Sequence, residues 1–306
     1  FLEQSLPSLE FDYSSMPRHE DFAALEIHDA DLESLQNLPT TIDGRSSLWV
    51  DLDGEGMSGV LLESGSGWYY KRNLSAGTWV PTLDGGDRAT LRLGPAEMIA
   101  VRPNTRLADG QVRLMDLDGD GSVEATILDG PLAGFWQRVA DTEGWSPFRP
   151  FSSRPDLNMA DPNLRLVDLT GDGQADILLT EDRVLTWYPS LGKAGYGPSE
   201  QLGQSLDEEQ GPRLVFAGAT QSIYLSDLSG DGLTDLTRIR NGEICYWPNL
   251  GYGRFGAKVT MDHSPLLDAW DDFDPSRVRL VDVDGSGAVD IIYLNRDHAR
   301  VYFNHA

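Results

Sequence analysis

The net charge of −25 over 306 residues argues against a nucleic-acid partner, whose phosphates this chain would repel. Hydrophobic residues make up 40% of the chain, enough for a sizeable core. No apolar run reaches the roughly 18–20 residues of a transmembrane helix. Cys245 is the sole cysteine, so no internal disulfide supports the fold.

The first 45 residues precede the repetitive part of the chain. The opening stretch, FLEQSLPSLEFDYSS, lacks the basic start and long apolar run of a signal peptide, and we expect a cut inside a longer polypeptide. Residues 29–38, DADLESLQNL, are expected to form one short helix. We therefore divide the chain into a lead-in segment, 1–45, and a repetitive domain, 46–306.

An acidic loop of one nine-residue pattern occurs five times in this domain. The first aspartates of successive loops are 65, 52, 59 and 55 residues apart, and independent turns would not share one frame by chance. The loops are DLDGEGMSG (51–59), DLDGDGSVE (116–124), DLTGDGQAD (168–176), DLSGDGLTD (227–235) and DVDGSGAVD (282–290). Because 16 of the 49 acidic residues lie in them, part of the negative charge is gathered where a cation could offset it.

Each loop lies between two short apolar segments that predict β-strands, such as LRLVD before the third loop and ILLT after it. In three repeats a tight turn follows, and Asn241-Gly242 in the fourth is a strong hairpin signal. An aromatic third strand comes next, such as VLTWYPS (184–190). Glycine-rich turns, LGKAGYGP (191–198) and LGYGRFGA (250–257), then precede a weaker fourth strand. A four-stranded sheet repeated radially is a propeller blade.

The sequence therefore predicts an all-β fold, a β-propeller of about five to six four-stranded blades over residues 46–306. A linear β-solenoid is the alternative, but its repeats are usually much shorter than 52–65 residues. The fifth repeat stops at VYFNHA, before its glycine turn. Two ways of closing the ring stay open: residues 1–45 supply strands to the closing blade, or sequence outside this chain completes it.

The loops have the spacing of oxygen ligands for structural calcium. Counted from the first aspartate, positions 1, 3, 5 and 9 can present side-chain oxygens, and calcium takes six to eight hard oxygens in irregular geometry. An EF-hand begins alike but needs a glutamate at position 12, where these loops have Leu, Ile, Leu, Arg and Tyr. The candidate ligands are Asp116, Asp118, Asp120, Glu124, Asp168, Thr170, Asp172, Asp176, Asp227, Ser229, Asp231, Asp235, Asp282, Asp284, Ser286 and Asp290.

The five loops are not equal. Loop 116–124 is the most acidic, whereas the first loop offers Asp51, Asp53 and Glu55 but has Gly59 at position 9 and is expected to be a weak site. The alternative interpretation is metal-free. In that case the carboxylates accept backbone N–H hydrogen bonds in an Asx-turn network.

Other motifs carry less weight. GYGRFG (251–256) matches G-x-G-x-x-G, but no helix start follows it, so a dinucleotide site is not expected. The histidines share no metal-ligand spacing and no G-x-S-x-G elbow occurs, so we expect no catalytic or cofactor-binding residue and no enzymatic activity.

Seven tryptophans could line sugar pockets between blades, although core packing is favoured. They are Trp68, Trp79, Trp136, Trp145, Trp187, Trp247 and Trp270.

Several longer segments are more specific than the calcium-type loop alone. They are DLTGDGQADIL with TEDRVLTWYPSLG, GPRLVFAGATQSIYLSDLSGDGLTD, IRNGEICYWPNLGYGRFGAKVTMD, WVDLDGEGMSGVLLE and ESLQNLPTTIDG. Together they resemble the propeller region of the B component of bacterial insecticidal Tc toxins, the SpvB-like class with FG-GAP/VCBS-type repeats. The resemblance covers about residues 30–306.

The resemblance implies a non-enzymatic assembly role in a secreted toxin complex. In that family the B and C components form a shell around a toxic polypeptide, and the B propeller docks on the pore-forming A component and gates release. Two other classes stay open. One is a calcium-dependent glycan-binding or adhesion propeller, and the other, ranked last, is a calcium-dependent enzyme.

Overall fold

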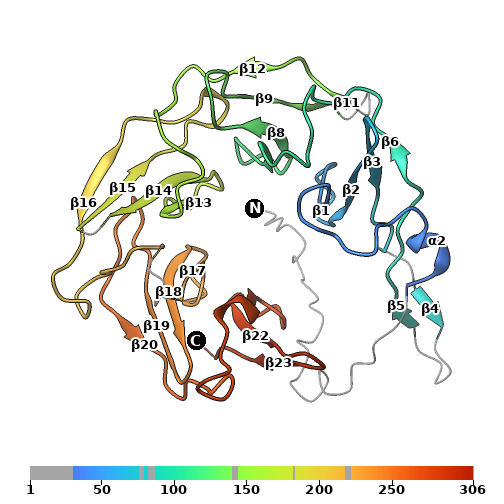
Figure 1. Ribbon diagram of the computed structural model, residues 1–306. Helices are drawn as coiled ribbons and strands as arrows, with labels where there is room; N and C mark the ends of the chain where they lie inside the picture. The colour runs from blue at the N-terminus through green and yellow to red at the C-terminus, as the bar shows by residue number, and fades with distance from the viewer. Residues whose placement is uncertain are drawn as a thin grey trace, which may run out of the picture.

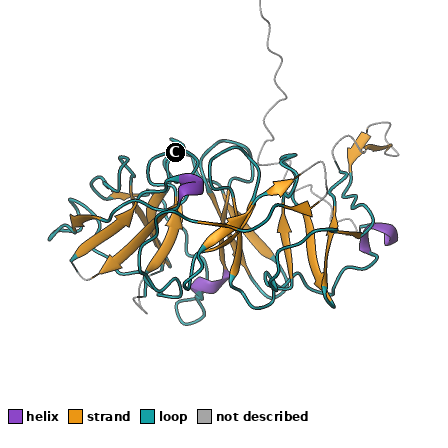
Figure 2. Cartoon of the chain, turned by 90° about the horizontal axis from the view of Figure 1, so that it is seen from above, coloured by secondary structure: helices purple, strands orange, loops and turns teal. Residues whose placement is uncertain are grey.

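The computed structural model describes residues 30–75, 79–81, 87–139, 144–181, 183–217 and 222–305. Over these residues the chain is an all-β propeller whose five blades follow one another around a central axis (Figure 1). Seen at 90° to that view, the blades stand side by side in one layer (Figure 2). The predicted fold is confirmed, with five blades. No helix in the described part of the chain is long and apolar enough to cross a membrane.

Four blades are four-stranded antiparallel sheets, and the fifth has three strands among the described residues. The first contains β1 (Ser47–Val50), β2 (Gly59–Ser64), β3 (Gly67–Lys71) and β6 (Glu97–Met98). The second contains β7 (Val112–Met115), β8 (Glu124–Ile127), β9 (Gly134–Trp136) and β12 (Arg149–Pro150). The third contains β13 (Leu164–Val167), β14 (Asp176–Glu181), β15 (Val184–Tyr188) and β16 (Glu200–Gly203).

The fourth blade contains β17 (Ile223–Ser226), β18 (Asp235–Arg240), β19 (Glu243–Trp247) and β20 (Val259–Thr260). The fifth contains β21 (Val278–Val281), β22 (Asp290–Leu294) and β23 (Ala299–Tyr302). Two small hairpins interrupt the third-to-fourth connections of the first two blades. They are β4 (Trp79–Pro81) with β5 (Asp87–Ala89), and β10 (Arg138–Val139) with β11 (Gly144–Trp145).

The order of connections decides which loops share a rim of the ring. In every blade the acidic loop joins the first strand to the second, and a connection of two to six residues joins the second to the third. Because successive strands run antiparallel, the acidic loops and the third-to-fourth connections lie on one rim. We call it the loop rim. The connections between the second and third strands and the linkers between blades lie on the opposite rim, which we call the turn rim.

The hairpin predicted at Asn241-Gly242 is present. Strand β18 pairs with β19 so that Arg240 lies opposite Glu243, with two residues between them. Gly242 has φ 81°, a conformation that favours glycine. The side chain of Asn241 is also used, because its Oδ1 accepts a hydrogen bond from the backbone N–H of Leu267 at 2.7 Å.

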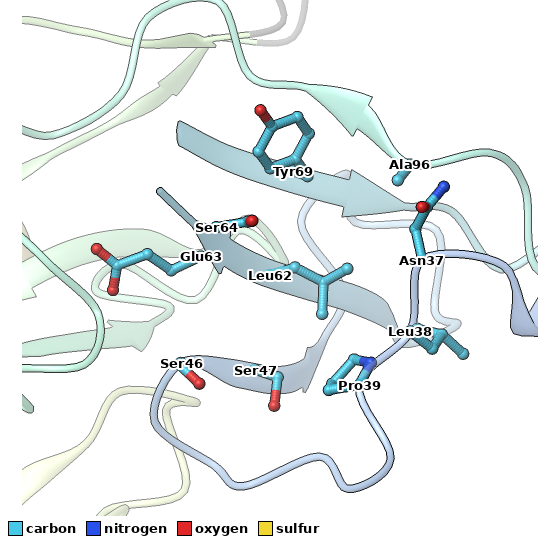
Figure 3. A pocket seen from close by; sticks show the side chains of 10 residues that line it. All are labelled: Asn37, Leu38, Pro39, Ser46, Ser47, Leu62, Glu63, Ser64, Tyr69 and Ala96. Atoms are coloured by element: carbon cyan, nitrogen blue, oxygen red, sulfur yellow. The ribbon is translucent and has the colours of Figure 1, made fainter. Parts of the chain in front are cut away.

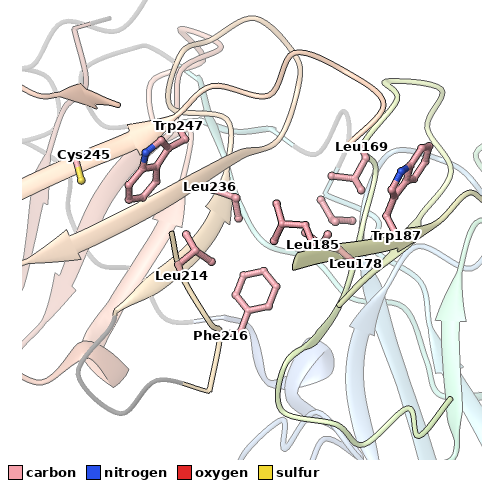
Figure 4. Packing of buried hydrophobic residues seen from close by; sticks show 10 residues of the cluster. Leu169, Leu178, Leu185, Trp187, Leu214, Phe216, Leu236, Cys245 and Trp247 are labelled. Carbon is pink, nitrogen blue, oxygen red and sulfur yellow. The ribbon is translucent and has the colours of Figure 1, made fainter. Parts of the chain in front are cut away.

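The core consists of apolar layers between neighbouring blades. In the third blade Leu178 lies opposite Trp187, and both belong to the layer shared with the fourth blade, which includes Leu236 and Trp247 (Figure 4). The adjacent Ile177 belongs instead to the layer shared with the second blade. Successive residues of a strand point to opposite faces, so a middle blade is apolar on both sides. Corresponding layers join the first to the second and the fourth to the fifth blade.

Core packing explains most of the tryptophans. Trp68, Trp145, Trp187 and Trp247 are buried, and Trp68 meets Trp145 edge to face with ring centroids 6.3 Å apart. Trp136 is partly buried in the same layer as Trp68 and Trp145. Trp270 differs, since it is 74% exposed. The side chain of Trp79 lies outside the described residues.

The described part of the lead-in segment covers one face of the first blade. Helix α2 (Leu32–Leu35) is shorter than the predicted 29–38, because the backbone is already extended at Gln36. Leu38 and Ile42 then pack against the apolar face of β2 that points away from the second blade. Residues 1–29 lie outside the described residues, so their role in closing the ring stays a prediction.

Candidate cation centres on the loop rim

The acidic loops of neighbouring blades touch one another along the loop rim. A Cβ added at Gly54 would lie 3.2 Å from the carbonyl oxygen of Gly121, and one at Gly119 would lie 3.2 Å from that of Asp172. Gly54 and Gly119 have φ values of 70° and 73°. Position 4 of the loop therefore favours glycine both for its backbone conformation and for the close approach of the next loop. The five candidate centres form one row.

The first aspartate of each loop holds the loop together. In loop 227–235, Oδ1 of Asp227 accepts N–H bonds from Gly230 at 2.7 Å and Asp231 at 3.2 Å, and Oδ2 accepts one from Gly232 at 2.8 Å. Asp51, Asp116, Asp168 and Asp282 accept corresponding bonds. The Asx-turn network of the metal-free alternative is thus present, and it orders the loop whether or not a cation binds.

The carboxylate at position 9 ties the loop to the third strand. Asp235 is fully buried; its Oδ2 accepts N–H bonds from Leu228 and Ser229, both at 3.1 Å, and its Oδ1 accepts one from Asn249 at 2.9 Å. Asp176 and Asp290 do the same with the backbone N–H groups of Ser190 and Asn304. The sequence could not identify these partners. The donors are backbone N–H groups, which every residue except proline has, so no residue type marks their positions.

Burial changes the protonation of two of these carboxylates, Asp176 and Asp235. Desolvation is the largest effect on Asp176 and raises its pKa to about 6, although N–H bonds from Ser190 and Leu169 act in the opposite direction. Burial also raises the pKa of Asp235. The folded state therefore holds the Asp176 proton more tightly than the unfolded chain does. This contribution to stability is complete below about pH 4 and is lost as the pH rises through about 6.

Among the residues that the structure describes, two sets of three carboxylates could hold a metal ion. Asp116, Asp118 and Asp120 form one set, and Asp282, Asp284 and Asp290 form the other; within each, one oxygen per residue lies within 4.8 Å of the rest. Such groups of hard oxygens fit a divalent cation. The hydroxyls of Thr170 and Ser229 instead lie 3.4 and 3.3 Å from the first aspartates of their own loops. For the remaining predicted ligands, metal binding stays a prediction.

Basic side chains from outside the pattern contact two of the loops. In the first loop, Asp53 lies 3.2 Å from a guanidinium nitrogen of Arg72 and 3.1 Å from one of Arg138, which comes from the second blade. In loop 116–124 the ammonium of Lys193, from the third blade, lies 2.5 Å from Asp118 and 3.2 Å from Glu124. Sequence reasoning missed all three cations. Arg138 and Lys193 come from the next blade, and contacts between blades have no fixed spacing in the chain, whereas Arg72, in the first blade itself, lies outside the nine-residue pattern.

A pocket of about 540 Å³ lies between the lead-in segment and the first blade. Figure 3 shows its mixed lining, in which the Tyr69 ring and the apolar Leu62 stand among amide, hydroxyl and carboxylate groups. The lining residues are Asn37, Leu38, Pro39, Ser46, Ser47, Leu62, Glu63, Ser64, Tyr69 and Ala96. Glu63 is already engaged, because Arg106 and the backbone N–H of Ala108 bind its two oxygens.

Comparison with known proteins gives matches among solved structures, whereas no family model and no curated protein matches this chain. A chain of the Photorhabdus luminescens Tc holotoxin pore, with a TccC3-D651A mutation, superposes with a TM-score of 0.73 and 26% identity. The match covers 89% of this chain. This chain is similar to part of a Tc toxin complex. It spans only 12% of the length of that toxin chain.

A second match concerns the fold alone. An Agrocybe aegerita lectin that recognises non-reducing terminal N-acetylglucosamine superposes with a TM-score of 0.56 and 19% identity. That match covers 85% of this chain and 63% of the lectin. Propellers of this shape therefore occur in a toxin assembly and in a sugar-binding protein.

Proposed function

We propose that this chain is a non-enzymatic docking propeller of a secreted toxin-complex B component, of the SpvB-like class with FG-GAP/VCBS-type repeats. It would help close the shell formed with a C component and dock that shell on the pore-forming A component, where it acts as a gate. The observation that carries the proposal is the likeness to a Tc holotoxin chain over 89% of the sequence. Loop chemistry alone would not distinguish this role from that of other propellers.

The turn rim offers a surface for such docking. Trp270 and Leu266 are 74% and 58% exposed, and both lie beside Gly242, since a Cβ there would be 3.1 Å from Leu266 and 4.0 Å from Trp270. Leu132, between β8 and β9, and Leu206, in the linker after β16, are 70% and 88% exposed on the same rim. Adjacent exposed apolar side chains, such as Trp270 and Leu266, form the kind of patch that marks protein interfaces, and tryptophan is enriched among the residues that dominate binding.

We expect binding to a Tc pore-forming component, measured by biolayer interferometry at low and high salt, to weaken as salt rises. The reason is that charge complementarity contributes to steering. Trp270→Ser should weaken binding about tenfold or more, as loss of a central interface residue does. The control is Tyr252→Ser, which alters a similarly exposed aromatic residue on the loop rim (69%). Absence of binding at every salt concentration, with a correctly folded propeller, would contradict the docking role.

We further propose that the cation of the loop rim is calcium with a structural role. A ligand that binds only the folded state stabilises it by about 2.7 kcal/mol at a hundredfold excess over Kd. Calcium should therefore raise the melting temperature and a chelator should lower it. Asp284→Asn should reduce this difference, whereas Asp271→Asn, an exposed acid outside the loops, should leave it unchanged. Identical melting curves in calcium and in chelator would leave only the Asx-turn interpretation.

Carbohydrate binding is the second candidate, favoured by the pocket between the lead-in segment and the first blade. An aromatic ring beside hydroxyl and amide groups is a surface on which a sugar can stack and form hydrogen bonds. The buried tryptophans, by contrast, leave no aromatic face free for sugar. A glycan array with Tyr69→Ala as the control distinguishes the two candidates: glycan binding that depends on Tyr69, without binding to the pore component, would favour the lectin-like role.

A further inference from the structure

The glycine turn of the third blade lies directly over the acidic loop of the second. Residues 192–194 form one 3-10 turn. A Cβ added at Gly192, which has φ 60°, would lie 3.2 Å from the carbonyl oxygen of Leu117 and 3.6 Å from the Cβ of Asp118. The backbone of the turn is therefore held against loop 116–124, and the next side chain along the turn is placed beside the carboxylates.

That side chain is Lys193. Its ammonium lies 2.5 Å from Asp118, 3.2 Å from the fully buried Glu124 and 3.9 Å from Asp120. One positive charge thus lies among three of the four carboxylates of the most acidic loop. A lysine ammonium paired with carboxylates is charged at neutral pH.

The fourth blade provides an internal comparison. Its glycine turn, LGYGR, has the same register as LGKAG in the third, so Tyr252 takes the place of Lys193. This turn also lies over the preceding acidic loop, because the backbone N–H of Tyr252 donates to the carbonyl of Leu169 at 3.1 Å. Tyr252 brings no positive charge, and no ion pair involves the acids of loop 168–176 in the described part of the chain. The two turns share their docking and differ in charge.

We propose that Lys193 is the built-in cation of loop 116–124, so that this loop takes no divalent ion while the lysine is present. The ammonium neutralises the carboxylates and, being covalently part of the third blade, also links that blade to the second. This assignment reverses the ranking expected from the sequence, in which the most acidic loop is the strongest metal site. It makes the second loop independent of calcium.

The test counts calcium ions per chain by equilibrium dialysis and compares Lys193→Met, which keeps the length of the side chain but not its charge, with the unaltered protein. The variant should bind one additional calcium ion. It should also melt several degrees lower in chelator, where the carboxylates repel one another, and recover in calcium. Lys193→Arg, which keeps the charge, should bind as many ions as the unaltered protein.

A second substitution keeps the test informative if Lys193→Met folds poorly. Asp118→Asn in the otherwise unaltered protein should leave the calcium count unchanged, because the loop holds no ion to lose. Added to Lys193→Met, it should remove the additional ion. A calcium ion lost on Asp118→Asn alone, or no ion gained by a folded Lys193→Met, would overturn the proposal.

Discussion

Replacement of Asp235 by alanine should lower the free energy of unfolding by about 3 kcal/mol, because it leaves buried N–H donors without an acceptor. The carboxylate accepts bonds from Leu228, Ser229 and Asn249, and it is fully buried, so water cannot readily take its place. Denaturant unfolding at neutral pH, with and without chelator, measures the effect. We expect a similar loss in both conditions, since these bonds need no metal.

The control is Asp231→Ala in the same loop. Asp231 accepts one bond, from the N–H of Leu233 at 2.9 Å, at an exposed position. In chelator its removal should change stability by no more than about 0.5 kcal/mol, as surface substitutions usually do. If Asp235→Ala loses stability only when calcium is present, position 9 acts mainly as a metal ligand and its role in binding the third strand is minor.

Trp247→Ala should cost about 3–5 kcal/mol, the usual range for removing a large aromatic side chain from a core. Trp247 is fully buried between the third and fourth blades, and its indole N–H donates to the carbonyl of Glu208 at 2.8 Å. The guanidinium of Arg238 lies over its ring, 5.3 Å from the centroid. Loss of this side chain opens a cavity between two blades and leaves a carbonyl without its partner.

Trp270→Ala is the matched control, because the same residue type is 74% exposed on the turn rim. Its melting temperature should stay close to that of the unaltered chain. The melting temperatures of both variants and of the unaltered chain should be measured by thermal unfolding at equal calcium concentration. A loss of stability for Trp270→Ala as large as that for Trp247→Ala would show that the turn rim has a structural role, and docking would then need another surface.

The repeat pattern by itself determined much of the fold. Short apolar segments, five loops in one frame and the Asn241-Gly242 turn are local signals, and they were sufficient to predict β-strands and a propeller of about five to six blades. The Asx-turn network could also be predicted, because its donors and acceptors lie within six residues of each other. Such features depend on backbone conformation over one short segment.

Only the tertiary structure decided what surrounds each acidic loop. Lys193 lies 75 residues from Asp118, and Arg138 lies 85 residues from Asp53, so no spacing rule could bring them together. The same holds for the tryptophans, since burial of Trp247 and exposure of Trp270 depend on which blade face meets a neighbour. The first three loops are similar in sequence but differ in the charge beside them, because they meet Arg138, Lys193 and Tyr252 of the next blade.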